Sequence, residues 1–510
     1  MAQNSELYAA LDLGSNSFHL LIASVEDDNL KVIDRHKDMV RLAGGLDDNG
    51  NLSEESQRRA LDSLAKMANR LSGVPKQRIR VVGTNTLRAA NNAADFMAQA
   101  EAILGVPINI ISGTEEARLV YLGVAKDFAP GERSRLVADI GGGSTEIVVG
   151  NHVPRLLESL PMGCVSFSMR YFPGGEISEK GFRRAVNAGR RLISPYVEQF
   201  KDQWQEAVGS SGTIRAIAKI MDEQKLSDAG YITKAGLDAL KEQMLKVDHV
   251  NKLDIVGLSD DRDEVFPGGF SVLYALFQEL DIQAMHVSTF AVREGIVYDL
   301  AGRLHHRNDT RDHTIQKLIA QFHIDGKQGD RVAALCERWF PTIQPHCQTP
   351  EEEALDLLRW SAQLHELGLA IAHGGYHKHG GYILSYADLP GFSRQEQARL
   401  SFLVLNHRRK PKPPSTLVYG VNPDWLLACV LRLACIFYRR RQTAPLREDI
   451  TLTCESGTEL SLTLPAGWME DNPLVAADLD EEVELLKKGT DIKLTIRVSD
   501  DHAVTTRASG

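Results

Sequence analysis

Residues 10–21, ALDLGSNSFHLL, decide the fold, because residues 137–148, VADIGGGSTEIV, repeat their pattern. The Asp, the first Gly and the Ser of the two stretches coincide at a constant offset of 127 residues. Each copy is typical of a strand, a tight Gly/Ser turn and a second strand. We therefore predict two related lobes that face each other across a cleft.

Around these stretches, short apolar runs alternate with amphipathic helical patterns up to about residue 305. A helix is predicted over residues 53–72, with Ser53 as its N-cap and Glu54 and Glu55 in its first turn. A second helix is predicted over residues 93–104. The predicted strands cover residues 8–13, 18–25, 29–40, 78–83, 108–112, 135–140 and 147–150. This alternation indicates an α/β protein.

The texture changes after residue 305. Residues 312–440 are helical in pattern, and the tail combines strand-like segments with a helix at residues 475–488. A chain of 510 residues is too long for one hydrophobic core. We predict two lobes, a helical domain and a small α+β domain, over residues 1–125, 126–305, 306–445 and 446–510.

Composition narrows the class of protein. The six cysteines are scattered without a Cys-x-x-Cys pair, no secretory signal is visible at the start, and no stretch approaches 18 consecutive apolar residues. We expect a cytoplasmic protein without an integral membrane segment, and peripheral association with a membrane stays open.

The net charge of -10 argues against a polyanionic ligand only if the charge is spread evenly, and it is not. Residues 401–450 hold nine basic and three acidic residues, whereas residues 451–510 hold five basic and twelve acidic residues. The basic segment is either a solvated face or an electrostatic path for a long phosphate chain. No base-reading motif accompanies it, so nucleic acid is not expected as a partner.

The glycine turns suit phosphate. Glycine lets the backbone approach an anion, and successive N–H groups can then form an anion-binding nest. An Asp at the strand end could hold a divalent ion beside that phosphate. Two copies, with a third glycine loop at residues 209–213, are hard to explain as structural turns alone.

Several motifs together resemble the exopolyphosphatase/guanosine pentaphosphate phosphohydrolase family. They are residues 12–19, 83–88, 112–118 and 139–146, extended by residues 162–166, 209–213 and 292–295. The resemblance covers the whole chain, with the motifs in family order. It implies two actin-like lobes of ribonuclease-H type with a catalytic cleft, an HD-like helical domain, a homodimer, and hydrolysis of a phosphoanhydride with Mg²⁺.

The resemblance also assigns roles. Glu116 is expected to be the general base; from the sequence alone, Glu115 and Glu116 could equally be first-turn acids of a helix. Asp139, Glu146 and, less directly, Asp12 are expected to hold Mg²⁺ or its waters, although they could instead cap loop N–H groups. Cys164 is expected to be a small buried thiol. The expected phosphate ligands are Asn16, Ser17, Arg88, Gly143, Ser144, Thr145, Ser211, Gly212 and Arg262.

The helical half carries His365-Glu366, where HD phosphohydrolases have a His-Asp pair, so a second metal site there is not expected. We expect an exopolyphosphatase that removes terminal orthophosphate processively from inorganic polyphosphate. The alternative is hydrolysis of guanosine pentaphosphate to the tetraphosphate, and one enzyme with both activities stays open. A non-catalytic sensor of polyphosphate or guanosine tetraphosphate is the hypothesis from a different class.

Overall fold

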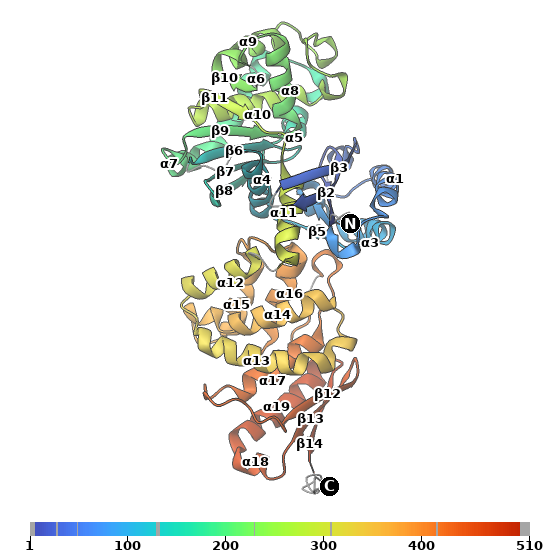
Figure 1. The fold of residues 1–510 in the computed structure, drawn as a ribbon, viewed down its shortest axis with the longest axis vertical. Coiled ribbons are helices and arrows are strands. Elements are labelled where there is room, and N and C mark those ends of the chain that lie inside the picture. The colour runs from blue at the N-terminus through green and yellow to red at the C-terminus, as the bar shows by residue number, and fades with distance from the viewer. Residues whose placement is uncertain are drawn as a thin grey trace. The chain divides into compact units, whose positions relative to one another are not determined.

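The computed structural model describes residues 6–26, 29–47, 49–128, 133–228, 230–305, 309–414 and 417–499. The chain folds into two compact units, Met1–Asp309 and Thr310–Gly510 (Figure 1). No helix among the described residues is both long and apolar enough to cross a membrane.

The first sheet of the first unit has five strands in the order β3-β2-β1-β4-β5. The first three are antiparallel, whereas β4 is parallel to β1 and β5 is parallel to β4. The strands are β1 (Leu7–Leu13), β2 (Phe18–Glu26), β3 (Asn29–Asp38), β4 (Ile79–Gly83) and β5 (Ile108–Ile110).

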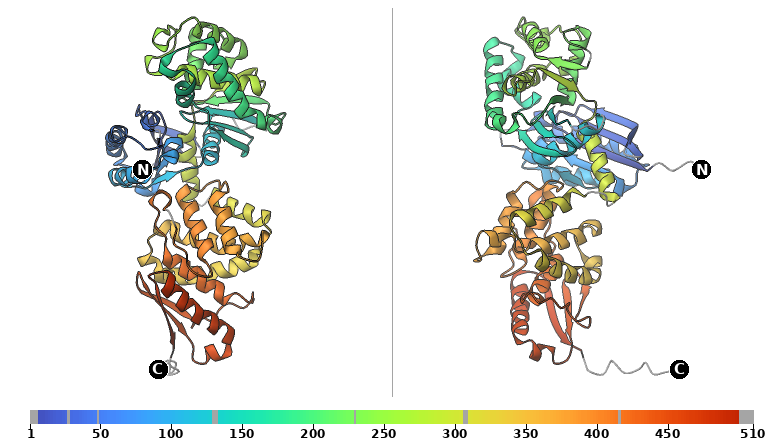
Figure 2. Two further views of the ribbon diagram at one scale, coloured as in Figure 1. Left: turned by 180° about the vertical axis from the view of Figure 1, so that it is seen from behind. Right: turned by 60° about the vertical axis from the view of Figure 1, so that its left-hand side comes forward.

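The second sheet repeats this topology. Its order is β10-β11-β9-β6-β7-β8. Read from the other edge, the strands β8-β7-β6-β9-β11 correspond to β3-β2-β1-β4-β5 of the first sheet, and β10 is an additional edge strand. The strands are β6 (Arg135–Ile140), β7 (Thr145–Gly150), β8 (Pro154–Leu160), β9 (Glu206–Ser210), β10 (Tyr231–Thr233) and β11 (Ala284–Val287). The predicted duplication is therefore confirmed, and both sheets can be followed in blue and green in Figure 2.

Helices cover the two sheets. As predicted, the first helix follows Ser53, whose side chain accepts a hydrogen bond from Ser56 N at 3.3 Å. The helices of this unit are α1 (Glu54–Leu71), α2 (Asn85–Ala89), α3 (Ala93–Leu104), α4 (Gly113–Asp127), α5 (Cys164–Tyr171), α6 (Glu179–Ile193), α7 (Val197–Phe200), α8 (Ser211–Glu223), α9 (Lys234–Met244), α10 (Phe266–Glu279) and α11 (Val292–Leu304).

Two helices join the lobes. α4 packs on β7 and β8 of the second sheet, and α11 packs on β1 and β2 of the first. They cross so closely that a Cβ on Gly123 would lie 2.2 Å from Ala291 O, and one on Gly295 would lie 1.8 Å from Leu119 O. One buried cluster containing Val82, Val120, Val208 and Ile296 spans both lobes. The two lobes therefore share a core.

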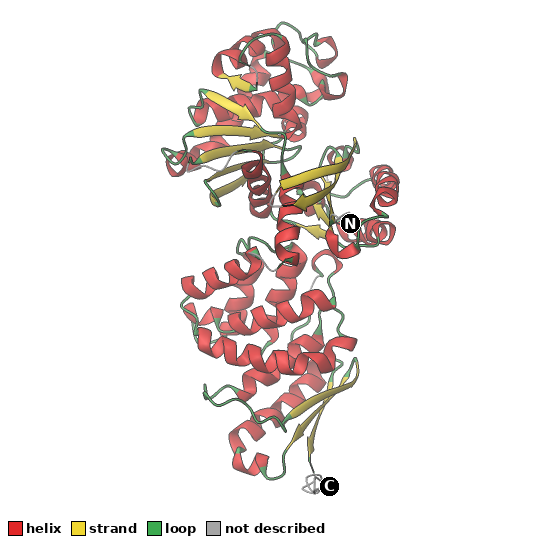
Figure 3. Cartoon of the chain, in the orientation of Figure 1, coloured by secondary structure: helices red, strands yellow, loops and turns green. Residues whose placement is uncertain are grey.

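The second unit is mainly helical, with a three-stranded sheet near its end (Figure 3). β13 pairs antiparallel with β12 and parallel with β14. Its elements are α12 (Thr310–Gln321), α13 (Gly326–Ile343), α14 (Glu351–Leu364), α15 (Tyr376–Tyr386), α16 (Arg394–Asn406), α17 (Trp425–Phe437), β12 (Thr451–Ser456), β13 (Glu459–Leu464), α18 (Trp468–Asp471), α19 (Pro473–Gly489) and β14 (Lys493–Val498). One core includes both Leu426 and Leu460. The division at residue 446 stays a prediction.

Candidate active site

The two glycine turns of the repeat meet at a cavity of about 160 Å³ in the first unit. A Cβ on Gly142 would lie 2.9 Å from Ser15 Cβ and 3.5 Å from Asn16 N, so the turns face each other at close range. A Cβ on Gly143 would lie 2.4 Å from Asn85 Oδ1. Glycine is required at these two positions because residues of the other lobe lie so close. Since glycine has no side chain, its backbone N–H can approach a ligand directly.

The third glycine segment differs from the predicted loop. β9 ends at Ser210 and α8 begins at Ser211, so strand passes directly into helix. Ser211 has the left-handed φ of 96°, which is a strained conformation for a residue other than glycine and is often found at functional sites. The start of α8, at Ser211, Gly212 and Thr213, lines the cavity, and the N–H groups at a helix N-terminus can bind an anion.

Strand pairing brings two of the predicted acids to the same edge. In β1–β2, Asp12 pairs with His19, and at the equivalent place in β6–β7, Asp139 pairs with Glu146. Glu116 lies in the first turn of α4, whose N-cap Ser112 accepts a hydrogen bond from Glu115 N at 3.0 Å. Glu116 is therefore both a first-turn acid of α4 and a residue that lines the cavity.

The acids resist ionisation together. Burial raises the pKa of Asp12 to about 7, against the lowering effect of Arg293 and with a contribution from Asp139. Burial and Asp139 raise the pKa of Glu146 to about 7. Burial and then Glu146 raise the pKa of Glu116 well above its ordinary value, and burial also raises that of Asp139. A bound cation would favour the ionised forms of these carboxyls.

Two oxygen atoms support that interpretation. Asp12 Oδ1 and Glu116 Oε2 are buried and have no hydrogen-bond partner among the described residues. Asp139 instead accepts a hydrogen bond from Ser210 Oγ, and Glu146 Oε1 accepts one from Ser159 Oγ at 2.8 Å. No described group of three or more His, Cys, Asp or Glu side chains could hold a metal ion by itself. The donors fit Mg²⁺, which takes one or two carboxylates and completes its shell with water and phosphate oxygens.

The predicted phosphate ligands divide into two groups. Those that line the cavity are Asn16, Ser17, Gly143, Ser144, Ser211, Gly212 and Arg262. Thr145 is buried outside this lining, and its Oγ1 donates to Met162 O at 2.5 Å. Glu146, which is predicted to hold the metal, is likewise buried and is not among the residues that line the cavity. Arg88 lies beside Glu116, with 3.7 Å between Nη1 and Oε2, and it donates to Ile111 O at 2.6 Å.

Three further cations line the cavity, namely Lys37, Arg215 and Arg293. Arg293 Nη1 donates to His19 Nδ1 at 2.9 Å, and His19 Nε2 lies 2.7 Å from Ser17 Oγ. Burial, with Arg293, lowers the pKa of His19 well below its ordinary value. Sequence reasoning missed these cations, although Arg293 belongs to one of the quoted motifs.

Glu115 and Cys164 have structural roles. Glu115 is buried and accepts hydrogen bonds from Arg118 at 2.7 and 2.8 Å. Arg118 also donates to Asp299 on α11 at 2.6 Å, so this network ties α4 to α11. Cys164 is buried, and burial raises the pKa of its thiol, which does not favour a nucleophile.

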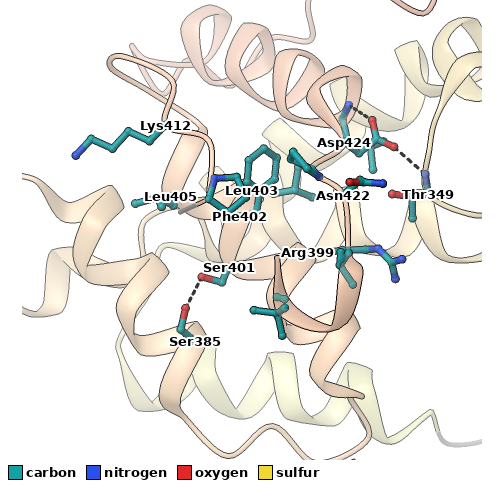
Figure 4. Close-up of a pocket in the computed structure, with 16 residues that line it drawn as sticks. Thr349, Ser385, Arg399, Ser401, Phe402, Leu403, Leu405, Lys412, Asn422 and Asp424 are labelled. Carbon is teal, nitrogen blue, oxygen red and sulfur yellow. Dashed lines mark hydrogen bonds between the residues drawn. The ribbon is translucent and has the colours of Figure 1, made fainter. Parts of the chain in front are cut away.

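The second unit offers a different kind of cavity, of about 190 Å³ (Figure 4). Its lining is mostly apolar, and two of its charged residues have structural partners: Arg399 donates to Glu353 at 2.7 Å, and Asp424 accepts from Thr349 N at 2.9 Å. Lys412 is the third charged residue of the lining. Asp424 also caps α17. We assign no chemistry to it.

Two buried histidines of this unit are hydrogen-bonded to the helices that they follow. His365 Nδ1 lies 2.6 Å from Ala362 O, and His407 Nδ1 lies 2.7 Å from Val404 O. Glu366, the acid that replaces the Asp of an HD pair, accepts a hydrogen bond from Arg441 at 2.6 Å. The HD-like character of this unit stays a prediction.

Comparison with known proteins adds sequence relatives. The chain matches the Ppx/GppA phosphatase family over residues 21–304 and domain III of Ppx/GppA phosphatases over residues 310–483. A guanosine-5'-triphosphate,3'-diphosphate pyrophosphatase of Vibrio vulnificus is 39% identical over 484 residues, which cover 94% of this chain and 96% of that protein. A protein of the same name from Vibrio cholerae is 38% identical over 485 residues, with the same coverage.

Solved structures confirm the actin-like fold of the lobes. An exopolyphosphatase from Cytophaga hutchinsonii superposes with a TM-score of 0.53 at 24% identity, over 58% of this chain and 98% of that one. An Aquifex aeolicus member of the Ppx/GppA family gives 0.51 at 23% identity, over 59% of this chain and 99% of that one. At such identities the likeness shows the fold alone.

These comparisons correct the expected activity. The expectation of an exopolyphosphatase acting on inorganic polyphosphate is wrong, because the relatives that match nearly the whole chain are named for guanosine 5'-triphosphate,3'-diphosphate. The motifs could not separate the two substrates, since the roles predicted for them concern terminal phosphates, which both substrates have. The alternative, guanosine pentaphosphate, is the better supported.

Proposed function

Because the chain belongs to the Ppx/GppA phosphatase family, we propose that it hydrolyses the terminal phosphoanhydride bond of guanosine pentaphosphate. The products are orthophosphate and guanosine tetraphosphate. The observation that carries the proposal is the buried Glu116 carboxyl beside two facing glycine turns, in a chain whose full-length relatives are named for this nucleotide.

In the proposed reaction, Glu116 accepts a proton from a water molecule whose oxygen bonds to the terminal phosphorus. The bond between that phosphorus and the bridging oxygen breaks, and the bridging oxygen stays on the tetraphosphate. Backbone N–H groups of the two turns hold the phosphoryl oxygens, and Arg215 and Arg293 offset their charge. Arg88 supports the ionised form of Glu116, since it lowers the pKa that burial raises.

We also propose that Mg²⁺ is the cofactor, with Asp12 and Asp139 as the residues that hold it or its waters. When bound, Mg²⁺ would neutralise phosphate charge during the reaction. Glu146 supports this edge from behind the cavity through Ser159. The homodimer and the cytoplasmic location implied by the resemblance stay predictions.

The test is product analysis with the full chain and guanosine pentaphosphate, with Mg²⁺ and after chelation by EDTA. We expect equal amounts of orthophosphate and guanosine tetraphosphate, and loss of most turnover with EDTA that added Mg²⁺ restores. Release of pyrophosphate, or no release, would overturn the proposed reaction. Full turnover in EDTA would remove the metal from it.

A further inference from the structure

A second, larger cavity adjoins the cavity of about 160 Å³ that contains Glu116, which we call the phosphate cleft. The second cavity has no role in the reaction described above. It measures about 520 Å³ and shares Ser15 and Asn16 with the smaller cleft. It lies between the 3₁₀ turn η1 (Leu42–Gly45) of the first lobe and α5 of the second. A ligand that leaves the phosphate cleft past Ser15 and Asn16 therefore enters this cavity.

The size and the walls of this cavity suit a nucleoside. Small-molecule sites commonly measure 300–1,000 Å³, whereas the smaller cleft has room only for the end of a phosphate chain. Val165, Met169, Phe172 and Val250 supply apolar surface, and Met169 is 62% exposed. A charged phosphate chain gains nothing from contact with apolar side chains, whereas the flat face of a purine base can pack against them.

Two charged residues from opposite lobes stand at the same cavity. Arg41 Nη1 lies 3.1 Å from Glu264 Oε2, and both side chains are more than half exposed. An ion pair of this kind contributes little to stability, so a ligand can replace it at low cost. Arg41 also has a left-handed φ of 53°, and its N–H donates to Asn16 O at 2.8 Å. Arg41 is thus hydrogen-bonded directly to the first glycine turn, which contains Asn16.

We propose that this cavity binds the guanosine part of the substrate and that Glu264 and Arg41 recognise the guanine edge. Guanine presents two adjacent donors, N1–H and the 2-amino group, next to the acceptor O6. A carboxylate accepts from the two donors, and a guanidinium donates to O6. Adenine has an amino group and a bare nitrogen on that edge, so the same pair selects against it.

This inference rests on the proposed function, and it goes further by naming the residues that distinguish a nucleotide from an inorganic phosphate chain. Its test is calorimetric binding of guanosine tetraphosphate and of inorganic tripolyphosphate to the full chain. Glu264→Ala removes the acceptor, and Met169→Glu places charge on an apolar wall; both residues are exposed enough for the fold to tolerate the change.

We expect each variant to bind guanosine tetraphosphate about tenfold or more weakly than the wild type does, and its affinity for tripolyphosphate to fall much less. The preference of the wild-type chain for GDP over ADP should narrow in Glu264→Ala. Glu198→Ala, an exposed acid on α7, is the matched control and should bind as the wild type does.

Unchanged tetraphosphate binding in both variants, or an equal loss for both ligands, would overturn the inference alone. A wild-type chain that does not hydrolyse guanosine pentaphosphate would overturn the proposed function, and this inference with it. The two failures are therefore distinguishable.

Discussion

Two neighbouring acids on α4 differ because their surroundings differ. Glu115 lies in a buried network in which Arg118 and Arg80 face it, and Asp299 accepts hydrogen bonds from both of these arginines. Glu116 lines the cavity and forms an ion pair with Arg88 at 3.7 Å. The network fixes the start of α4 and leaves the Glu116 carboxyl available for chemistry.

Replacing Glu116 with Gln should therefore lower kcat for guanosine pentaphosphate about 10²–10⁴-fold, because the amide cannot accept the proton of the attacking water. Binding of guanosine tetraphosphate should be retained, since the side chain keeps its size and loses only charge. Assays of phosphate release measure kcat, and calorimetry measures the binding of guanosine tetraphosphate.

The control for this variant is Glu242→Gln, which changes an exposed acid on α9. It should leave kcat and binding as in the wild type. A Glu116→Gln enzyme that keeps wild-type kcat would exclude the side chain as the general base.

Local sequence predicted the acids and turns of this site but only part of its positive charge. Lys37 pairs with His19 across β2 and β3, a register that the hairpin pattern alone does not define. Arg215 and Arg293 are brought to the cleft by α8 and α11, far along the chain. Their recognition requires the three-dimensional fold.

At the scale of elements, the repeat predicted the two strand hairpins and their equivalence. The predicted strand at residues 135–140 and helix at residues 93–104 agree with β6 and α3. The prediction failed where strand passes straight into helix at Ser210–Ser211, because a short segment of Gly and Ser residues suggests a loop. It also missed the short α2, which begins two residues after the end of β4 and lies within the motif at residues 83–88 and the residue after it.

The crossing of α4 and α11 gives a prediction at this scale. Gly295→Ala would place a methyl group 1.8 Å from Leu119 O if nothing moved, so the helices must separate. Overpacking of this kind costs about 1–3 kcal/mol, and a displaced α4 moves Glu116. We expect a lower free energy of unfolding in urea and a lower kcat.

Gly73→Ala provides the control, because a Cβ there would meet nothing within 4 Å. Wild-type stability and kcat in Gly295→Ala would mean that the crossing can open without affecting the site.

At the scale of the whole molecule, the segment with excess positive charge pairs with the acidic tail. Arg432 is buried and binds Glu482 at 2.5 and 2.8 Å, and Arg439 binds Asp478 at 2.5 and 2.6 Å. Arg441 is engaged by Asp325 and Glu366. Arg432 and Arg439 thus pair with acids of the tail, whereas the partners of Arg441 lie outside the tail. Because Arg439 and Arg441 are engaged by acids, these pairs do not favour the alternative of an electrostatic path along residues 401–450.

Three buried histidines of this unit make stability depend on pH. Burial, then nearby positive charge, lowers the pKa of His377 to about 4, and burial lowers the pKa values of His365 and His407. An unfolded histidine binds a proton near pH 6.5. Between pH 6.5 and about 4 the unfolded chain therefore binds more protons than the folded chain, so these groups reduce stability as pH falls.

Buried acids act in the opposite direction, since the pKa of Glu353 is raised to about 7 and its folded form binds the proton first. The prediction therefore concerns the difference between wild type and His377→Gln, in which the other groups cancel. His377 Nδ1 is buried and has no hydrogen-bond partner in the described part of the chain, so the N–H that it carries in the imidazolium form would lack an acceptor. The midpoint of the variant should rise relative to that of the wild type as pH falls from 7.5 to 5, by about 2–4 °C for each kcal/mol relieved. Calorimetric melts at several pH values measure this difference; the exposed His373→Gln should show none, and a pH-independent difference for His377→Gln would contradict the assignment.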